Sequence, residues 1–205
     1  MMKVITLAAQ KGGAGKTTLA VHLAVQAHKA GERVVLVDTD PQGSATAWAR
    51  ARGEDAPVIV AATSSQLSDV MTAARNDGMT LVILDTPPHA APGAAAASTL
   101  ADLVLVPVRP SAFDLAASGA SAEIARTAKR AAFVLSACPS RAPEIMEARK
   151  ALELQGLPVL DTEIGERRSY ARAVASGRAV AEFEPAGRAA HEISQLWREI
   201  KKVIA

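Results

Sequence analysis

The sequence KGGAGKTT at residues 11–18 lies between an apolar run at 4–9 and a second, mostly apolar segment at 19–24. This order is typical of a strand, a glycine-rich loop and a helix. Glycines allow backbone N–H groups to close around phosphate oxygens, and a helix N-terminus favours a bound anion. The stretch therefore predicts a phosphate-binding loop made of Lys11, Gly12, Gly13, Ala14, Gly15, Lys16, Thr17 and Thr18.

This loop contains one lysine more than a nucleotide requires. Lys16 is placed to reach the β- and γ-phosphates of a nucleotide, and the Thr17 hydroxyl to ligate Mg²⁺. The usual pattern begins with glycine at position 10, where this chain has Gln10, and Lys11 opens the loop instead. The second cation therefore needs a separate explanation.

Composition restricts the class of protein. The chain has 205 residues, which suits a single domain over 1–205, and is 49% hydrophobic but only 3% aromatic. A formal net charge of +2 means that any affinity for nucleic acid must come from local clusters of arginine and lysine. Cys138 is the only cysteine, which excludes an intramolecular disulfide and indicates a small buried thiol. Without a secretory signal or a run of about 20 apolar residues, we expect a cytoplasmic protein.

Apolar runs alternate with helical patterns along the whole chain. This alternation predicts an α/β fold with a doubly wound, mostly parallel sheet and helices on both faces. Ligands of such sheets bind at the carboxyl ends of the strands. We expect strands at 2–8, 33–38, 58–61, 80–85, 102–107 and 131–137, and helices at 16–30, 43–52, 64–77, 93–100, 114–129, 142–155, 167–176 and 186–204.

Three aspartates follow two of these strands. Asp38 and Asp40 come at and after the end of 33–38, and Asp85 ends 80–85. A carboxylate beside a phosphate loop can hold a Mg²⁺-bound water, so we predict a metal site of Thr17, Asp38 and Asp85. Asp40 is predicted to orient an attacking water. The alternative is that these aspartates only cap turns and helices.

The motifs resemble those of the ParA/MinD family of P-loop NTPases, which carry the deviant Walker A loop KGGxGKTT. The chain is most similar to the short ParA proteins of the ParF type. The resemblance rests on KGGAGKTT at 11–18, VDTDPQG at 37–43, LDTPP at 84–88 and VPVRPSAFD at 106–114. It implies a P-loop NTPase fold over essentially the whole chain.

The resemblance also implies an activity. Members hydrolyse ATP to ADP and phosphate with Mg²⁺, and ATP binding drives a face-to-face homodimer. Lys11 would then reach the partner's phosphates, in the manner of an arginine finger, and act in catalysis with Lys16 and Asp40. The ATP-bound dimer would bind DNA non-specifically and associate with the nucleoid. A ParB-like partner or cargo adaptor would stimulate hydrolysis during segregation of a plasmid or positioning of another cargo.

Basic residues in the last third of the chain are candidates for DNA contact. Two of them, Arg168 and Arg172, are four residues apart and share a helix face. Sequence-neutral DNA binding uses such residues on phosphates, although an ordinary solvated basic surface would have the same pattern. The predicted contacts are Arg167, Arg168, Arg172, Lys201 and Lys202.

The last expected helix, 186–204, suggests a rival function. Its apolar stripe includes Ile193, Leu196, Trp197 and Ile200, with Lys201 and Lys202 beside it. A basic amphipathic helix can lie on a membrane surface, as in a MinD-like positioning ATPase. We instead expect this helix to dock onto the domain, without stable membrane association. An iron–sulfur reductase would need more cysteine, and no additional substrate-binding segment indicates a small-molecule kinase or amidoligase.

Overall fold

The computed structural model describes residues 1–88 and 91–205, in which six strands form one sheet. Every strand pairing is parallel, and the strand order is β3-β2-β4-β1-β5-β6. All the expected strands form, with ends close to the expected ones. They are β1 (Lys3–Leu7), β2 (Val34–Asp38), β3 (Val58–Ala61), β4 (Leu81–Asp85), β5 (Leu103–Val108) and β6 (Ala131–Leu135).

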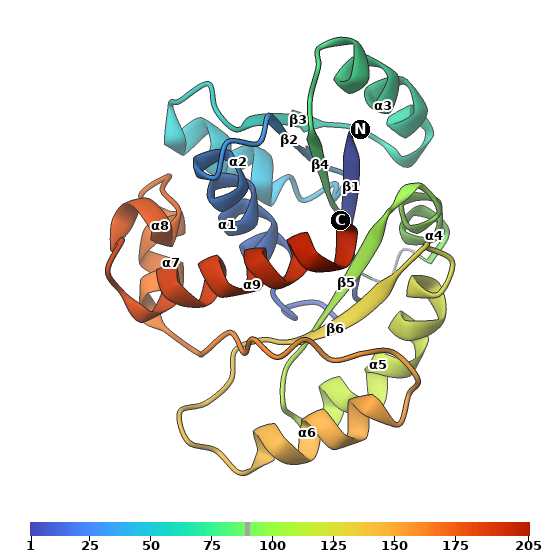
Figure 1. Ribbon diagram of the computed structural model, residues 1–205, viewed down its shortest axis with the longest axis vertical. Coiled ribbons are helices and arrows are strands. Elements are labelled where there is room, and N and C mark those ends of the chain that lie inside the picture. Colours follow the sequence, from blue (N-terminus) through green and yellow to red (C-terminus); the bar gives the residue numbers. More distant parts are fainter. Residues whose placement is uncertain (89–90) are drawn as a thin grey trace.

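Helices cover both faces of the sheet (Figure 1). Because side chains alternate along a strand, Leu103 and Leu105 of β5 enter one apolar core while Val104 and Val106 enter the other. The first face is covered by α1 (Lys16–Lys29), α2 (Ser44–Arg52), α7 (Arg168–Ala175), α8 (Val180–Phe183) and α9 (Arg188–Ile204). The second is covered by α3 (Leu67–Asn76), α4 (Ala91–Leu100), α5 (Ala112–Ala125) and α6 (Glu144–Glu153).

Several helix ends differ from the expected ones. The segment expected as one helix at 64–77 consists of a 3₁₀ turn, Ser64–Gln66, followed by α3. Helix α5 begins at Ala112 rather than at 114, because the Ser111 side chain caps it by accepting a hydrogen bond from the Asp114 N–H. The short helix α8 was not expected.

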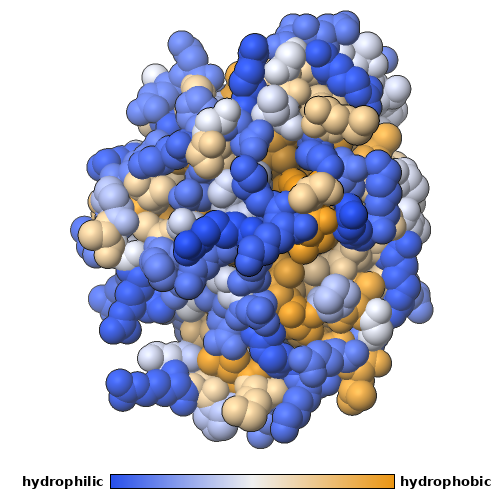
Figure 2. Space-filling view, in the orientation of Figure 1, coloured by the Kyte–Doolittle hydropathy of each residue, from blue (hydrophilic) through white to orange (hydrophobic). Residues whose placement is uncertain are grey.

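The amphipathic helix α9 docks onto the domain, as expected. Its apolar stripe, which includes Leu196, Trp197 and Ile200, is buried in the core on the α1 side of the sheet. Hydrophilic side chains gather over its outer surface (Figure 2). In the part of the chain that the structure describes, no helix combines the length and apolar character needed to cross a bilayer. The apolar stripe of α9, which the membrane-binding alternative requires to be exposed, is packed in the core of the domain.

Candidate nucleotide-binding site

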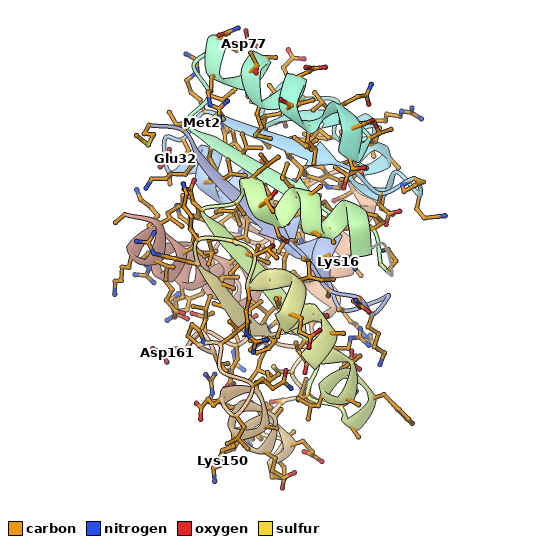
Figure 3. All side chains as sticks on the ribbon, turned by 90° about the vertical axis from the view of Figure 1, so that its right-hand side faces the viewer. Met2, Lys16, Glu32, Asp77, Lys150 and Asp161 are labelled. Atoms are coloured by element: carbon orange, nitrogen blue, oxygen red, sulfur yellow. The ribbon has the colours of Figure 1, made fainter. Side chains whose placement is uncertain are left out.

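The parallel sheet brings the predicted loop and aspartates to one edge. Leu7 of β1 is in register with Asp85 of β4, and Asp85 is in register with Asp38 of β2. The glycine-rich loop follows β1 directly and leads into α1. Figure 3 shows Lys16, at the start of α1, at the opposite end of the sheet from Met2 and Glu32. The carboxyl edge of the sheet therefore carries the predicted phosphate and metal residues together.

A cavity of about 480 Å³ opens at this edge. Residues 12–18 of the loop line it, together with Asp40 from the loop after β2. Gly15 has a φ of 100° and lies so close to Ser136 that an added Cβ would be 2.8 Å from its Oγ. Glycine is needed at this position for both backbone conformation and space. At Gly15 the loop consequently presents backbone rather than a side chain.

Lys16 is buried in the wall of this cavity. Its ammonium donates hydrogen bonds to the carbonyls of Ala9 at 3.1 Å and Lys11 at 3.5 Å. Burial lowers the pKa of Lys16, while Asp85 and Asp40 act in the opposite direction. A cation held by neutral carbonyls and desolvated in this way is suited to a bound anion such as a phosphate.

Asp85 is the clearest candidate for a metal-site residue. Among the described residues, neither of its buried carboxylate oxygens has a hydrogen-bond partner. Burial raises the pKa of Asp85 to about 7, while the nearby Thr17 hydroxyl, which lies outside good hydrogen-bond geometry, and Lys16 oppose the shift. Residues 1–88 and 91–205 contain no cluster of three or more His, Cys, Asp or Glu side chains able to hold a metal. Mg²⁺ does not need such a cluster, because it commonly uses one or two carboxylates, water and substrate phosphates.

The Asp38 carboxylate is engaged within the protein. Its Oδ2 accepts hydrogen bonds from the Thr46 N–H and hydroxyl, both at 2.9 Å, and its Oδ1 accepts from the Asp40 N–H at 3.2 Å. These contacts match the capping alternative and fix α2 to the end of β2. Asp40 lines the cavity, and its Oδ1 accepts from the Gln42 N–H at 3.0 Å. The metal role of Asp38 and the water-orienting role of Asp40 stay predictions.

Lys11 differs from Lys16 in its surroundings. Its ammonium is 2.6 Å from the buried Asp114 carboxylate and 6.0 Å from the centroid of the exposed Phe113 ring. Ser111 also donates to Asp114, so the lysine is tied to the start of α5. Lys11 is not among the described residues that line the cavity at the loop. The structure thus separates the two loop lysines, and a role for Lys11 across an interface stays a prediction.

Sequence reasoning missed the other half of the cavity. Ser136 and Ala137 follow β6, so the rule that ligands bind beyond strand ends could have identified them. Ala137 has a φ of 50°, which is uncommon for a residue other than glycine. Residues 164–167 and Tyr170 complete this side of the cavity but have no recognisable sequence signal.

The basic residues predicted to contact DNA lie in three places. Arg167 lines the cavity and forms an ion pair with Glu192. Arg168 and Arg172 are exposed on α7, where the Arg172 guanidinium lies 5.3 Å from the Phe183 ring centroid. Lys201 and Lys202 are exposed at the far end of α9. The fold does not gather all five residues into one patch, and their contact with DNA stays a prediction.

Comparison with known proteins supports this interpretation. The CbiA family model, the CobQ/CobB/MinD/ParA nucleotide binding domain, matches residues 5–180. The carboxysome distribution protein A of Halothiobacillus neapolitanus is 32% identical over 212 residues, covering 97% of each chain. The corresponding protein of Gloeobacter kilaueensis is 32% identical over 202 residues, covering 97% of this chain and 92% of its own.

Solved structures give the same fold. The cell division ATPase MinD of Pyrococcus furiosus superposes with a TM-score of 0.81 at 20% identity, covering 99% of this chain and 100% of its own. Apo McdA of Cyanothece superposes with a TM-score of 0.76 at 17% identity, with complete coverage of both chains. Family model, relatives and fold agree with the glycine-rich loop at the sheet edge, and the chain therefore belongs to the ParA/MinD family of P-loop nucleotide-binding proteins.

Proposed function

We propose that the protein is a Mg²⁺-dependent ATPase that converts ATP to ADP and phosphate and forms a homodimer when ATP binds. The different surroundings of its two loop lysines are the observation that carries the proposal. Lys16 lies in the cavity wall, whereas Lys11 extends away from it toward α5. Lys16 is placed to bind the nucleotide of its own chain. Lys11 would contact the nucleotide of a second chain after its ion pair with Asp114 breaks.

The cavity has groups suited to both ends of ATP. Residues 12–18 and Lys16 would bind the phosphates, and the base and ribose would lie toward Ser136 and residues 164–167. Thr17 and Asp85 would hold Mg²⁺, with Asp38 nearby, and the metal would neutralise charge on the phosphates. Asp40 would orient the attacking water from the cavity rim.

We further propose that the ATP-bound dimer binds DNA without sequence specificity, associates with the nucleoid and positions a large cargo. The names of relatives support this role. They include two maintenance of carboxysome distribution proteins and, over 51% of this chain, a chromosome-partitioning ATPase of Thermus thermophilus. A ParB-like protein or a cargo adaptor would stimulate hydrolysis and release the dimer.

Two lysine variants test the ATPase proposal. Lys16→Ala should lose nucleotide binding, because it removes the cation in the cavity wall. Lys11→Ala should still bind a fluorescent ATP analogue but lose ATP-dependent dimerisation, and its hydrolysis rate should fall by about 10²-fold or more. Light scattering after gel filtration and phosphate release are the measurements, with Lys150→Ala on α6 as a surface control. Normal dimerisation and hydrolysis by Lys11→Ala would exclude the action of Lys11 across the dimer.

A further inference from the structure

Glu192 of α9 contacts the nucleotide cavity only through other residues. Its Oε1 accepts hydrogen bonds from Arg167 Nε at 2.8 Å and from Arg167 Nη2. Its Oε2 accepts from the Gly165 N–H at 3.2 Å and the Tyr170 hydroxyl at 3.0 Å. All three donors line the cavity, while Glu192 does not line it and its side chain is only 12% exposed. We infer that Glu192 is the positioning residue that fixes the base-side wall of this cavity.

This wall needs support because its backbone is irregular. Residues 161–167 contain no helix or strand and touch the sheet edge through the isolated bridge between Cys138 and Gly165. Backbone hydrogen bonds to residues 135 and 138 hold Ile164 and Glu166. Arg149 and Glu199 hold residues 161–163, which do not line the cavity, and Glu192 holds the Gly165 N–H and the Arg167 and Tyr170 side chains, which do. One carboxylate therefore determines where the polar part of the wall lies.

Gly165 makes the arrangement sterically tight. A Cβ at this position would be 2.9 Å from Arg167 Nη2 and 3.0 Å from Arg167 Cζ. The guanidinium thus packs directly on the Gly165 backbone, and its ion pair with Glu192 keeps it there. Burial, together with the Glu192 carboxylate, raises the pKa of Tyr170, so the phenol stays protonated and donates to Glu192.

This geometry gives Arg167 and α9 roles at the cavity, in addition to the DNA contact and the docking onto the domain that the sequence suggests. Arg167 lines the cavity and pairs with Glu192 there, while its contact with DNA stays a prediction. The amphipathic helix α9 provides, besides its apolar face, the carboxylate that orders a loop more than 20 residues earlier in the chain. The inference rests on the proposed function, since it assumes that a nucleotide occupies the cavity.

The test compares Glu192→Gln with Glu199→Gln. Glu199 is a matched control on the same helix: it accepts hydrogen bonds from the Thr162 N–H and hydroxyl, and Thr162 does not line the cavity. Titration with fluorescent ATP and ADP analogues should show affinity weakened about tenfold in Glu192→Gln and unchanged in Glu199→Gln. The KM for ATP should rise in Glu192→Gln while kcat changes less than about twofold, as expected for loss of uniform binding.

A double-mutant cycle separates positioning from general stability. Tyr170→Phe combined with Glu192→Gln should weaken binding by clearly less than the product of the single effects, because both act through one contact. Thermal unfolding is measured for every variant. Multiplicative effects, or equal loss of affinity and stability in Glu192→Gln and Glu199→Gln, would overturn the inference. Wild-type affinity in Glu192→Gln would also overturn it, whereas failure of the wild-type protein to bind either nucleotide would instead refute the proposed ATPase.

Discussion

At the scale of single residues, Asp85 combines a candidate functional role with a cost in stability. Both of its oxygens are buried without a hydrogen-bond partner in the described part of the chain, and its pKa is raised from 3.8 to about 7, mainly by burial. Between these two pH values the folded protein binds more protons at Asp85 than the unfolded chain does. The contribution of Asp85 to stability therefore falls as the pH rises through this window.

The variant Asp85→Asn should consequently be more stable than the wild type when nucleotide and Mg²⁺ are absent. At pH 8 we expect its free energy of unfolding to increase by about 2–4 kcal/mol, because the buried charge is removed. Urea unfolding at pH 5 and pH 8 measures the effect, which should be less than half as large at pH 5, because only part of the window between the two pKa values lies below that pH. The same variant should lose the additional protection that Mg²⁺ gives with ATP. A less stable Asp85→Asn at pH 8 would contradict this account.

His22 has the opposite pH dependence. It is fully buried on α1, and its Nδ1 accepts a hydrogen bond from the Val180 N–H at 3.2 Å. Burial lowers its pKa from 6.5 to about 3, against the effect of Glu182. Below pH 6.5 the unfolded chain therefore binds the extra proton, and stability falls by up to about 1.4 kcal/mol per pH unit. His22→Asn, which keeps an acceptor but cannot titrate, should lose less stability than the wild type between pH 6.5 and 5.5 in urea unfolding. An identical loss in the two proteins would exclude His22 as the cause.

At the scale of elements, an ion pair joins α2 to α8. The Arg52 guanidinium donates to both Glu182 oxygens, at 2.8 and 2.7 Å, and only 3% of its side chain is exposed. Glu182→Ala should lower the free energy of unfolding by about 2–4 kcal/mol, since a buried guanidinium loses the only partner that binds it through both carboxylate oxygens. Glu54, 66% exposed, pairs with the same guanidinium, and Glu54→Ala should cost less than about 1 kcal/mol. Chemical denaturation of both variants provides the comparison, and equal costs would show that the burial of Arg52 does not decide the effect.

The strands could be predicted from the sequence, whereas the short helix α8 could not. The strands were predictable because buried parallel strands are continuous apolar runs, as in Leu103–Val108. The helix Val180–Phe183 is too short for a periodic pattern. It depends on Glu182, which accepts from the Ala179 N–H at 2.9 Å and pairs with Arg52, 130 residues away in sequence. Such tertiary contacts leave no local signal.

The candidate site was predictable to a similar extent. The phosphate-binding side is one contiguous loop, in which the spacing of the glycines and Lys16 is itself the signature of phosphate binding. The opposite side of the cavity, where we propose that the base lies, is assembled from Ser136, residues 164–167 and Tyr170, which meet only in the folded chain. The sequence suggested only a DNA contact for Arg167, because spacing alone cannot reveal that Glu192 holds this side chain at the cavity.

At the scale of the whole molecule, α9 separates two groups of exposed cations. The helix has 17 residues and is therefore about 25 Å long. Its first turns lie near α7 and the cavity, and its last turn lies near β1, where Lys3 donates to the Ile204 carbonyl (Figure 1). Arg168 and Arg172 are thus on the nucleotide side of the molecule, and Lys201 and Lys202 are on the other. We therefore expect DNA binding that depends on ATP to use Arg168 and Arg172, which lie near the cavity, rather than Lys201 and Lys202.

This separation allows a test of the DNA surface with an internal control. The double variant Arg168→Ala/Arg172→Ala should lose about tenfold or more in ATP-dependent affinity for duplex DNA, because two phosphate contacts disappear. The slope of log affinity against log salt should fall by about 2, while affinity for a fluorescent ATP analogue stays at the wild-type value. Lys201→Ala/Lys202→Ala, which removes the same charge from the far end of α9, should keep its DNA affinity. Fluorescence anisotropy with labelled duplex at several salt concentrations measures both variants. If the lysine variant loses DNA binding and the arginine variant retains it, DNA binds at the opposite end of α9.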